Sequence, residues 1–74
     1  MKVQIGKNGV TDGVLEHIKN AAKTHDQVTV NFLQSFTASN DVDEAAETIQ
    51  AYLDPIYDVT TETRGHTVKL LFED

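Results

Sequence analysis

Cysteine and tryptophan are absent from this chain of 74 residues, and proline occurs only once. Without cysteine the chain has no disulfide framework, no thiolate zinc site and no cysteine nucleophile. No apolar run approaches the length of a membrane span, and Met1 leads directly into a strand-like segment rather than a signal peptide. We therefore expect a soluble cytoplasmic protein that makes no membrane contact.

Basic residues are also scarce: six lysines and arginines face twelve acidic residues, for a net charge of −6. This balance argues against a general nucleic-acid binder, which usually carries a basic surface. Residues 1–25, however, hold four lysines against Asp12 and Glu16 and sum to +2, whereas residues 26–74 sum to −8. Three explanations stay open: chance clustering, a cytoplasm rich in salt that favours acidic surfaces, and a positive binding surface in the first third of the chain.

Apolar periodicity predicts four strands and two helices. Alternation predicts strands over residues 2–5 and 27–33, and a β-hairpin over residues 57–63 and 66–72 that turns at Arg64 and Gly65. Helical spacing predicts an amphipathic helix over residues 11–24, with Thr11 as its N-cap, and a second helix after Asp41 that ends before Pro55.

The predicted order is β-α-β-α-β-β, a single two-layer α/β domain over residues 1–74. Helical crossovers place the strands that they join parallel, and the final hairpin adds one antiparallel strand. The sheet is therefore expected to be mixed and four-stranded, with two helices. A chain of this size buries only about 60% of its unfolded surface, so a deep pocket for a large cofactor is not expected.

The segment Gly6-Lys7-Asn8-Gly9 lies between the first strand and the first helix. Asn-Gly is a strong hairpin signal, but the following segment is helical and offers no strand to close a hairpin. The alternative is a bare stretch of main chain that another molecule approaches closely. The adjoining helix N-terminus adds unpaired N–H groups and about half a positive charge, and Lys7 adds a mobile full charge. This combination suits a phosphate, although two glycines at this spacing occur in many proteins.

Catalytic and metal-binding chemistry has little support. The histidines His17, His25 and His66 form no HxxxH pair, and Asp41-Val42-Asp43-Glu44 lacks the glycine of a calcium loop. The serines have no nucleophile-elbow context. We expect a protein that is not an enzyme and has no cofactor and no metal; a small histidine hydrolase is the remote alternative.

The run VQIGKNGVTDGVLEHIKNA, followed by QVTVNFL and later by TRGHTVKLLF, resembles the CRM-domain family. This family comprises RNA-binding domains of chloroplast splicing factors and small YhbY-like proteins of bacteria and archaea. Its pattern is a strand, a G-x-x-G loop, a helix opening with Thr, an alternating strand, a second helix and a closing hairpin with Gly-His/Lys-Thr. The resemblance covers most of the chain, in the same order.

The resemblance implies a fold similar to the C-terminal domain of bacterial translation initiation factor three, and binding to structured RNA. YhbY-like members are associated with the large ribosomal subunit and its assembly, so ribosomal RNA or the large-subunit precursor is the implied partner. The G-x-x-G loop is likened to the clamping loop of KH domains. The implied RNA-binding residues are those of the loop and, less directly, of the hairpin: Gly6, Lys7, Asn8, Gly9, Gly65 and His66.

Further basic residues would widen this footprint: Lys2, Lys19 and Lys23, together with Arg64 and Lys69 if the hairpin lies on the same side. The chain departs from the family at three places: the usual N-terminal helix, the lysine-rich second strand (here Thr29 and Asn31), and the basic end of the last strand (here Glu73). An alternative therefore stays open, a protein-interaction module whose acidic second helix meets a basic ribosomal protein, with RNA binding weakened or lost. We expect a monomer.

Overall fold

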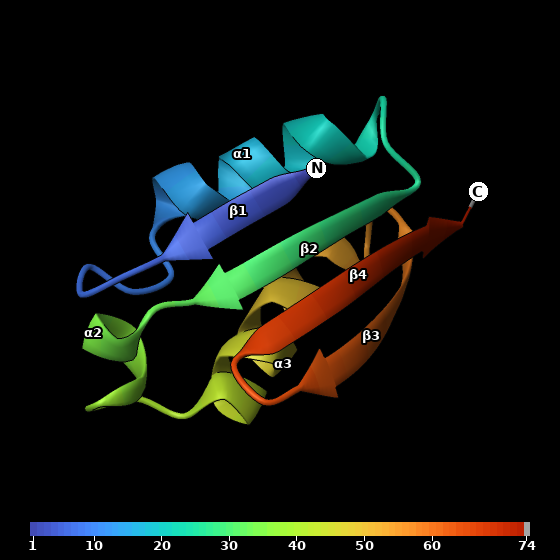
Figure 1. Ribbon diagram of the computed structural model, residues 1–74. Coiled ribbons are helices and arrows are strands. Elements are labelled where there is room, and N and C mark those ends of the chain that lie inside the picture. The colour runs from blue at the N-terminus through green and yellow to red at the C-terminus, as the bar shows by residue number, and fades with distance from the viewer. Residues whose placement is uncertain (74) are drawn as a thin grey trace.

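The computed structural model describes residues 1–73 and contains one mixed sheet of four strands (Figure 1). The strands are β1 (Lys2–Ile5), β2 (Gln27–Phe32), β3 (Asp58–Arg64) and β4 (Thr67–Glu73), in the spatial order β1-β2-β4-β3. β1 pairs parallel to β2, and β4 is antiparallel to both of its neighbours. The predicted fold class and the single antiparallel strand are confirmed. The strand pairing also shows that β4 lies inside the sheet, between β2 and β3.

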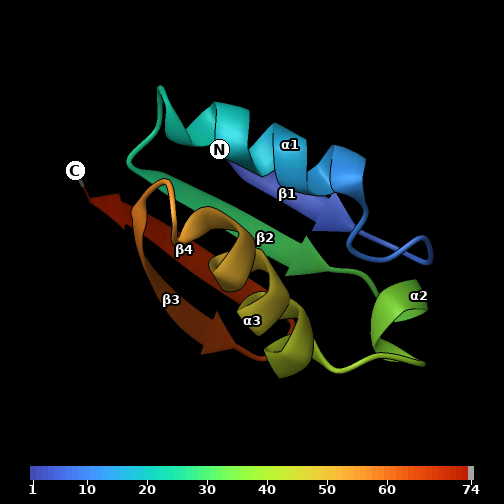
Figure 2. The same cartoon turned by 180° about the vertical axis from the view of Figure 1, so that it is seen from behind.

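Two helices, α1 (Asp12–Ala22) and α3 (Val42–Leu53), cover one face of the sheet, and the other face is open (Figures 1 and 2). Each helix begins at a side-chain cap. The Thr11 hydroxyl accepts a hydrogen bond from the Val14 N–H at 3.2 Å, and the Asp41 carboxylate accepts one from the Asp43 N–H at 2.9 Å. These bonds satisfy N–H groups that a helix start leaves without partners. None of the helices in residues 1–73 is long and apolar enough to cross a membrane.

The core lies between the sheet and the two long helices. Alternate strand residues such as Val30, Phe32 and Leu70 point toward the helices and are buried against Ile18 and Ile49. This follows from the period of two in a strand and the apolar stripe of each helix. No polar or charged side chain within residues 1–73 is buried. The core among these residues therefore contains no candidate catalytic or ligand-binding side chain.

A third, short helix, α2 (Gln34–Thr37), occupies part of the segment expected to be a loop. Its Phe36 side chain is buried, with its ring centroid 4.9 Å from that of Phe32. Four residues are too few to show helical periodicity, so the sequence carries no signal for this element. Tertiary burial of one aromatic ring stabilises α2, and α2 in turn lies against the segment that joins β1 to α1 (Figure 1).

Candidate nucleic-acid interface

The segment of residues 6–9 forms a tight turn, here called the glycine turn. The Gly9 N–H donates to the Gly6 carbonyl at 2.9 Å, so Lys7 and Asn8 are the two central residues. Neither has a positive φ, whereas Gly9 has φ 71°. An Asn-Gly hairpin turn of the primed type needs positive φ at its central residues, so that alternative is excluded. Lys7 and Asn8 are both exposed at the tip of the turn.

The two glycines of the turn serve different structural needs. A Cβ on Gly6 would lie 3.3 Å from Ser35 Oγ and 3.5 Å from Leu33 Cδ1, so Gly6 allows the turn to pack against the start of α2. A Cβ on Gly9 would meet only Phe36 Cε1 at 3.9 Å, but its left-handed backbone conformation disfavours other residues. The packing and the backbone conformation therefore explain both glycines without a ligand.

Several N–H groups around the turn have no protein partner. Within residues 1–73, the amides of Lys7 and Asn8 in the turn, and of Asp12 and Gly13 in the first turn of α1, donate no hydrogen bond. Such groups need water or a ligand acceptor, and the dipole of α1 adds partial positive charge at the same place. The Asp12 carboxylate opposes part of this charge. The surface nevertheless offers donors to an incoming anion.

The hairpin tip (residues 64–66) lies at the same end of the sheet as the glycine turn. The Leu33 N–H donates to the Ile5 carbonyl at 2.8 Å, and the Phe32 N–H donates to the His66 carbonyl at 2.8 Å. The end of β2 therefore stands between the two segments (Figure 1). With about 4.8 Å between neighbouring strands, the ends of β1 and β4 are about 10 Å apart. The structure thus brings together the two segments that the family pattern singled out.

The remaining basic residues do not form a single patch. Lys2 and Lys69 lie on the open face, in one row across β1, β2, β4 and β3, and Arg64 lies in the next row on the same face. Lys19 and Lys23 lie on the opposite side of the sheet, near the C-terminal end of α1 and away from the glycine turn. A ligand that touches the turn would have to cross the open face of the sheet to reach Lys2, Lys69 and Arg64. It would have to run along α1 to reach Lys19 and Lys23.

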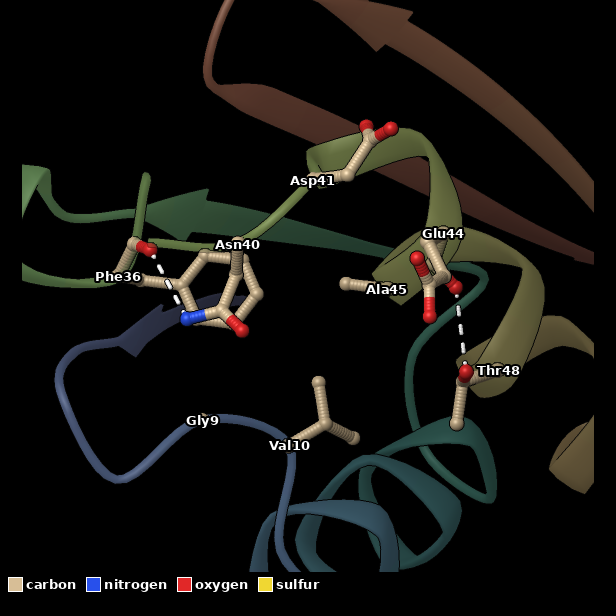
Figure 3. A pocket seen from close by; sticks show the side chains of 8 residues that line it. All are labelled: Gly9, Val10, Phe36, Asn40, Asp41, Glu44, Ala45 and Thr48. Atoms are coloured by element: carbon tan, nitrogen blue, oxygen red, sulfur yellow. Dashed lines mark hydrogen bonds between the residues drawn. The ribbon is translucent and has the colours of Figure 1, made fainter. Parts of the chain in front are cut away.

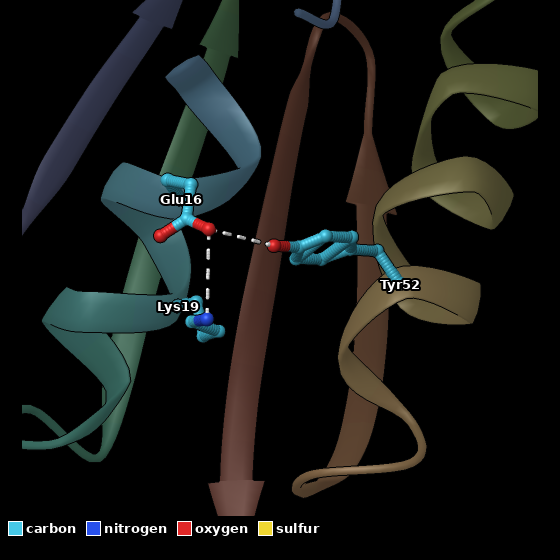
Figure 4. Close-up of polar contacts among 3 residues, drawn as sticks. All are labelled: Glu16, Lys19 and Tyr52. Atoms are coloured by element: carbon cyan, nitrogen blue, oxygen red, sulfur yellow. Dashed lines mark hydrogen bonds and ion pairs between the residues drawn. The ribbon is translucent and has the colours of Figure 1, made fainter. Parts of the chain in front are cut away.

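Lys19 is also engaged within the protein (Figure 4). Its Nζ lies 3.6 Å from Glu16 Oε1, and the same oxygen accepts a hydrogen bond from the Tyr52 hydroxyl of α3 at 3.4 Å. This exposed contact joins the two long helices. It leaves Lys19 less available to an external anion than Lys7, which forms no ion pair with any other of residues 1–73.

A groove of about 230 Å³ separates the glycine turn from the first half of α3 (Figure 3). Phe36, Val10 and Ala45 form its apolar lining, and Glu44 brings a carboxylate to it. The Asp41 carboxylate points away from the groove and caps α3. A phosphate in this groove would meet negative charge. A polyanion must therefore approach the turn from the side of its tip, where Lys7 and Asn8 are exposed.

The histidines form no common site. All three are exposed, and His25 Nδ1 lies 2.9 Å from the neighbouring Thr24 Oγ1. Among residues 1–73, no group of three or more histidine and carboxylate side chains is placed to hold a metal ion.

These features define a class: a small two-layer α/β domain that presents a glycine turn and the start of a helix at one end of a mixed sheet. The chain belongs to the CRS1 / YhbY (CRM) domain family, whose family model matches residues 1–57. The family is associated with RNA binding and ribosome assembly. The matched residues include the glycine turn and all three helices, and they end before β3. Among curated proteins no match was found.

Proposed function

We propose that this protein binds ribosomal RNA of the large subunit, or of its precursor, through the glycine turn, and that it acts in ribosome assembly without catalysing a reaction. Membership of an RNA-binding family supports RNA as the class of ligand. The location of the contact is supported by the exposed turn, with its unpartnered amides of Lys7 and Asn8, next to the N-terminus of α1. The proposed place of action is the cytoplasm.

In the proposed contact, the sugar-phosphate backbone lies against the tip of the turn. The Lys7 and Asn8 amides donate to phosphate oxygens, as do the free amides of Asp12 and Gly13, and the Lys7 ammonium neutralises charge. Because Gly9 and Gly6 hold the turn against α2, the amides are ordered before RNA arrives. Ordering them in the free protein lowers the entropic cost of binding.

Affinity is expected to be modest and dependent on salt. Each neutralised phosphate on a single strand contributes a slope of about −0.7 in log affinity against log salt. Among residues 1–73, the full positive charges at the end of the sheet that holds the glycine turn are those of Lys7 and Arg64. A shallow slope is therefore expected, in keeping with the net charge of −6.

The test compares Lys7→Ala with Lys23→Ala in titrations against fragments of large-subunit ribosomal RNA. Each variant removes one exposed lysine, but Lys23 lies at the far end of α1. Lys7→Ala should weaken binding and make the salt slope shallower by about 0.7–1, because one phosphate contact is lost. Lys23→Ala should bind like the wild type. Equal affinities of all three proteins would remove the turn from the mechanism.

The acidic face of α3 supports a second candidate, a protein-interaction module that docks a basic ribosomal protein. Its outward side chains Asp43, Glu44, Glu47 and Asp54 are exposed, and none forms an ion pair with any of residues 1–73. Such a surface attracts cationic partners over about one Debye length. Addition of RNA to isotope-labelled protein separates the two functions. Shifts of amide signals in residues 6–13 favour RNA binding at the turn, whereas shifts confined to α3 favour the interaction module.

A further inference from the structure

The open face of the sheet carries a small hollow that the glycine turn does not include. Figure 1 views the molecule from this face. The hollow has a volume of about 190 Å³ and is lined by Thr29 of β2, Thr67 and Lys69 of β4, and Glu62 and Arg64 of β3. It is here called the open-face hollow. None of its residues takes part in the core.

Strand register explains why a hollow forms at this place. Thr29, Lys69 and Glu62 are direct neighbours in one row across the sheet, and Thr67 and Arg64 are neighbours in the next row. The two threonines are short, whereas the surrounding lysine, arginine and glutamate side chains are long. Short side chains among long ones on a pleated surface leave a depression that long side chains border.

The chemistry of the open-face hollow suits one phosphate group. Arg64 and Lys69 supply two positive charges, and the Thr29 and Thr67 hydroxyls supply two neutral donors. Neither Arg64 nor Lys69 forms an ion pair with another of residues 1–73, although Glu62 stands opposite Lys69 in the register. Among the described residues that line the hollow, Glu62 is the one that opposes an anion.

The hollow also lies close to the end of the sheet that carries the glycine turn. β4 begins at Thr67, in the row nearest the hairpin tip, and Lys69 lies two residues further in, or about 7 Å along the strand. No aromatic side chain is present on this face within the described strands. Bases therefore have no stacking platform here, and contacts on this face go to phosphate and ribose.

We propose that RNA held by the glycine turn continues across the open face of the sheet and places a backbone phosphate in the open-face hollow. It does not follow the outer face of α1 past Lys19 and Lys23. This proposal rests on the proposed RNA-binding function and adds the path of the strand.

The sharpest test removes the carboxylate that opposes the phosphate. Glu62→Gln keeps the shape of the side chain and should tighten binding about threefold at low salt, the effect of one unit charge about 6 Å from a phosphate in water. Glu47→Gln is the matched control, because it makes the same charge change on the exposed face of α3, on the other side of the sheet. Its effect should be much smaller, since salt screens charges beyond about 8–10 Å.

A second pair of variants measures the number of phosphate contacts on each path. Arg64→Ala with Lys69→Ala removes two cations from the open face, and Lys19→Ala with Lys23→Ala removes two cations from α1. The probes are fragments of large-subunit ribosomal RNA and a short oligouridine strand, titrated over a range of salt. The open-face pair should make the salt slope shallower by about 0.7, the contribution of the one phosphate in the hollow, and the α1 pair should leave it near the wild-type value. Circular dichroism confirms that each variant is folded.

Each outcome of these titrations supports or refutes the proposed path of the RNA. The path is refuted if Glu47→Gln tightens binding as much as Glu62→Gln, because the effect is then one of net charge. It is also refuted if the α1 pair lowers the slope and the open-face pair does not. Weaker binding by Lys7→Ala together with unchanged binding by Glu62→Gln retains the glycine turn and rejects the path. Absence of binding by the wild type rejects both proposals.

Discussion

The clearest structural prediction concerns Gly9, the glycine that closes the turn. Its φ of 71° places the residue in the left-handed region, and the Gly9 N–H donates the hydrogen bond that closes the turn on Gly6. Gly9→Ala therefore tests the backbone conformation on which the candidate interface depends. Added atoms contribute little, because the new Cβ would be 3.9 Å from Phe36 Cε1, an ordinary van der Waals distance.

The expected loss follows from the backbone alone. An alanine in the left-handed conformation costs about 1–2 kcal/mol relative to the right-handed region. The reduced freedom of the unfolded chain offsets only part of this loss, because at a positive φ the cost in the folded state is the larger effect. The free energy of unfolding should fall by about 1–2 kcal/mol, which for a domain of this size lowers Tm by roughly 4–8 °C per kcal/mol.

Gly65→Ala is a matched control for this measurement. Gly65 has φ 57° at the hairpin tip, and nothing lies within 4 Å of its added Cβ. Thermal denaturation followed by circular dichroism should show similar losses for Gly9→Ala and Gly65→Ala. Gly9→Asn should recover part of the loss, because asparagine tolerates this conformation better. A Gly9→Ala protein as stable as the wild type, beside a destabilised Gly65→Ala protein, would refute the described turn.

Three further predictions concern the support of the candidate interface. Gly6→Ala should destabilise the protein by less than Gly9→Ala. Adding Ser35→Ala to Gly6→Ala should recover the lost stability, because Ser35 Oγ is the atom at 3.3 Å from the new Cβ. Thermal denaturation of the single and double variants measures both effects. Thr11→Ala should cost about 1 kcal/mol in urea unfolding through loss of the N-cap of α1, and Thr24→Ala, at an exposed position beyond the helix, should cost less. Phe36→Ala should cost about 3–5 kcal/mol, comparable to much of the stability of a small domain. Hydrogen exchange of the Gly9 amide, which donates to the Gly6 carbonyl, should become faster in this variant because the turn loses its packing against Phe36.

Much of the fold could be predicted from the sequence, because the signals for its main elements are local. Alternation in QVTVNF predicts β2, and the caps Thr11 and Asp41 predict the starts of α1 and α3. The observed bounds of these elements differ from the predicted bounds by no more than two residues. Two features were not predicted: the short helix α2, and the position of β4 between β2 and β3. Both depend on which distant segments pack together.

The glycine turn also combines a feature that local sequence predicts with one that depends on the packing of distant segments. Two glycines between a strand and a helix were sufficient to single out residues 6–9, because glycine permits a tight turn or the close approach of another molecule. The sequence assigned both glycines to the approach of a ligand. The structure assigns Gly6 to packing against Ser35 and Gly9 to a left-handed conformation. The partner atoms lie 29 residues away in the chain in the case of Ser35, so no local pattern could reveal them.

By itself, the sequence determined the kinds of elements, their order, the family and the excess of positive charge in residues 1–25. Only the tertiary structure decided where those charges lie. Successive residues of a strand point to opposite faces, and helices cover one face of this sheet, so Lys2 is on the open side and Lys19 on the helical side although both belong to the same positive segment. The structure also brings Arg64 and Lys69, from the acidic remainder of the chain, to the face that carries Lys2. The composition of a segment determines its net charge, but the pairing of strands determines which charged side chains lie on the same face.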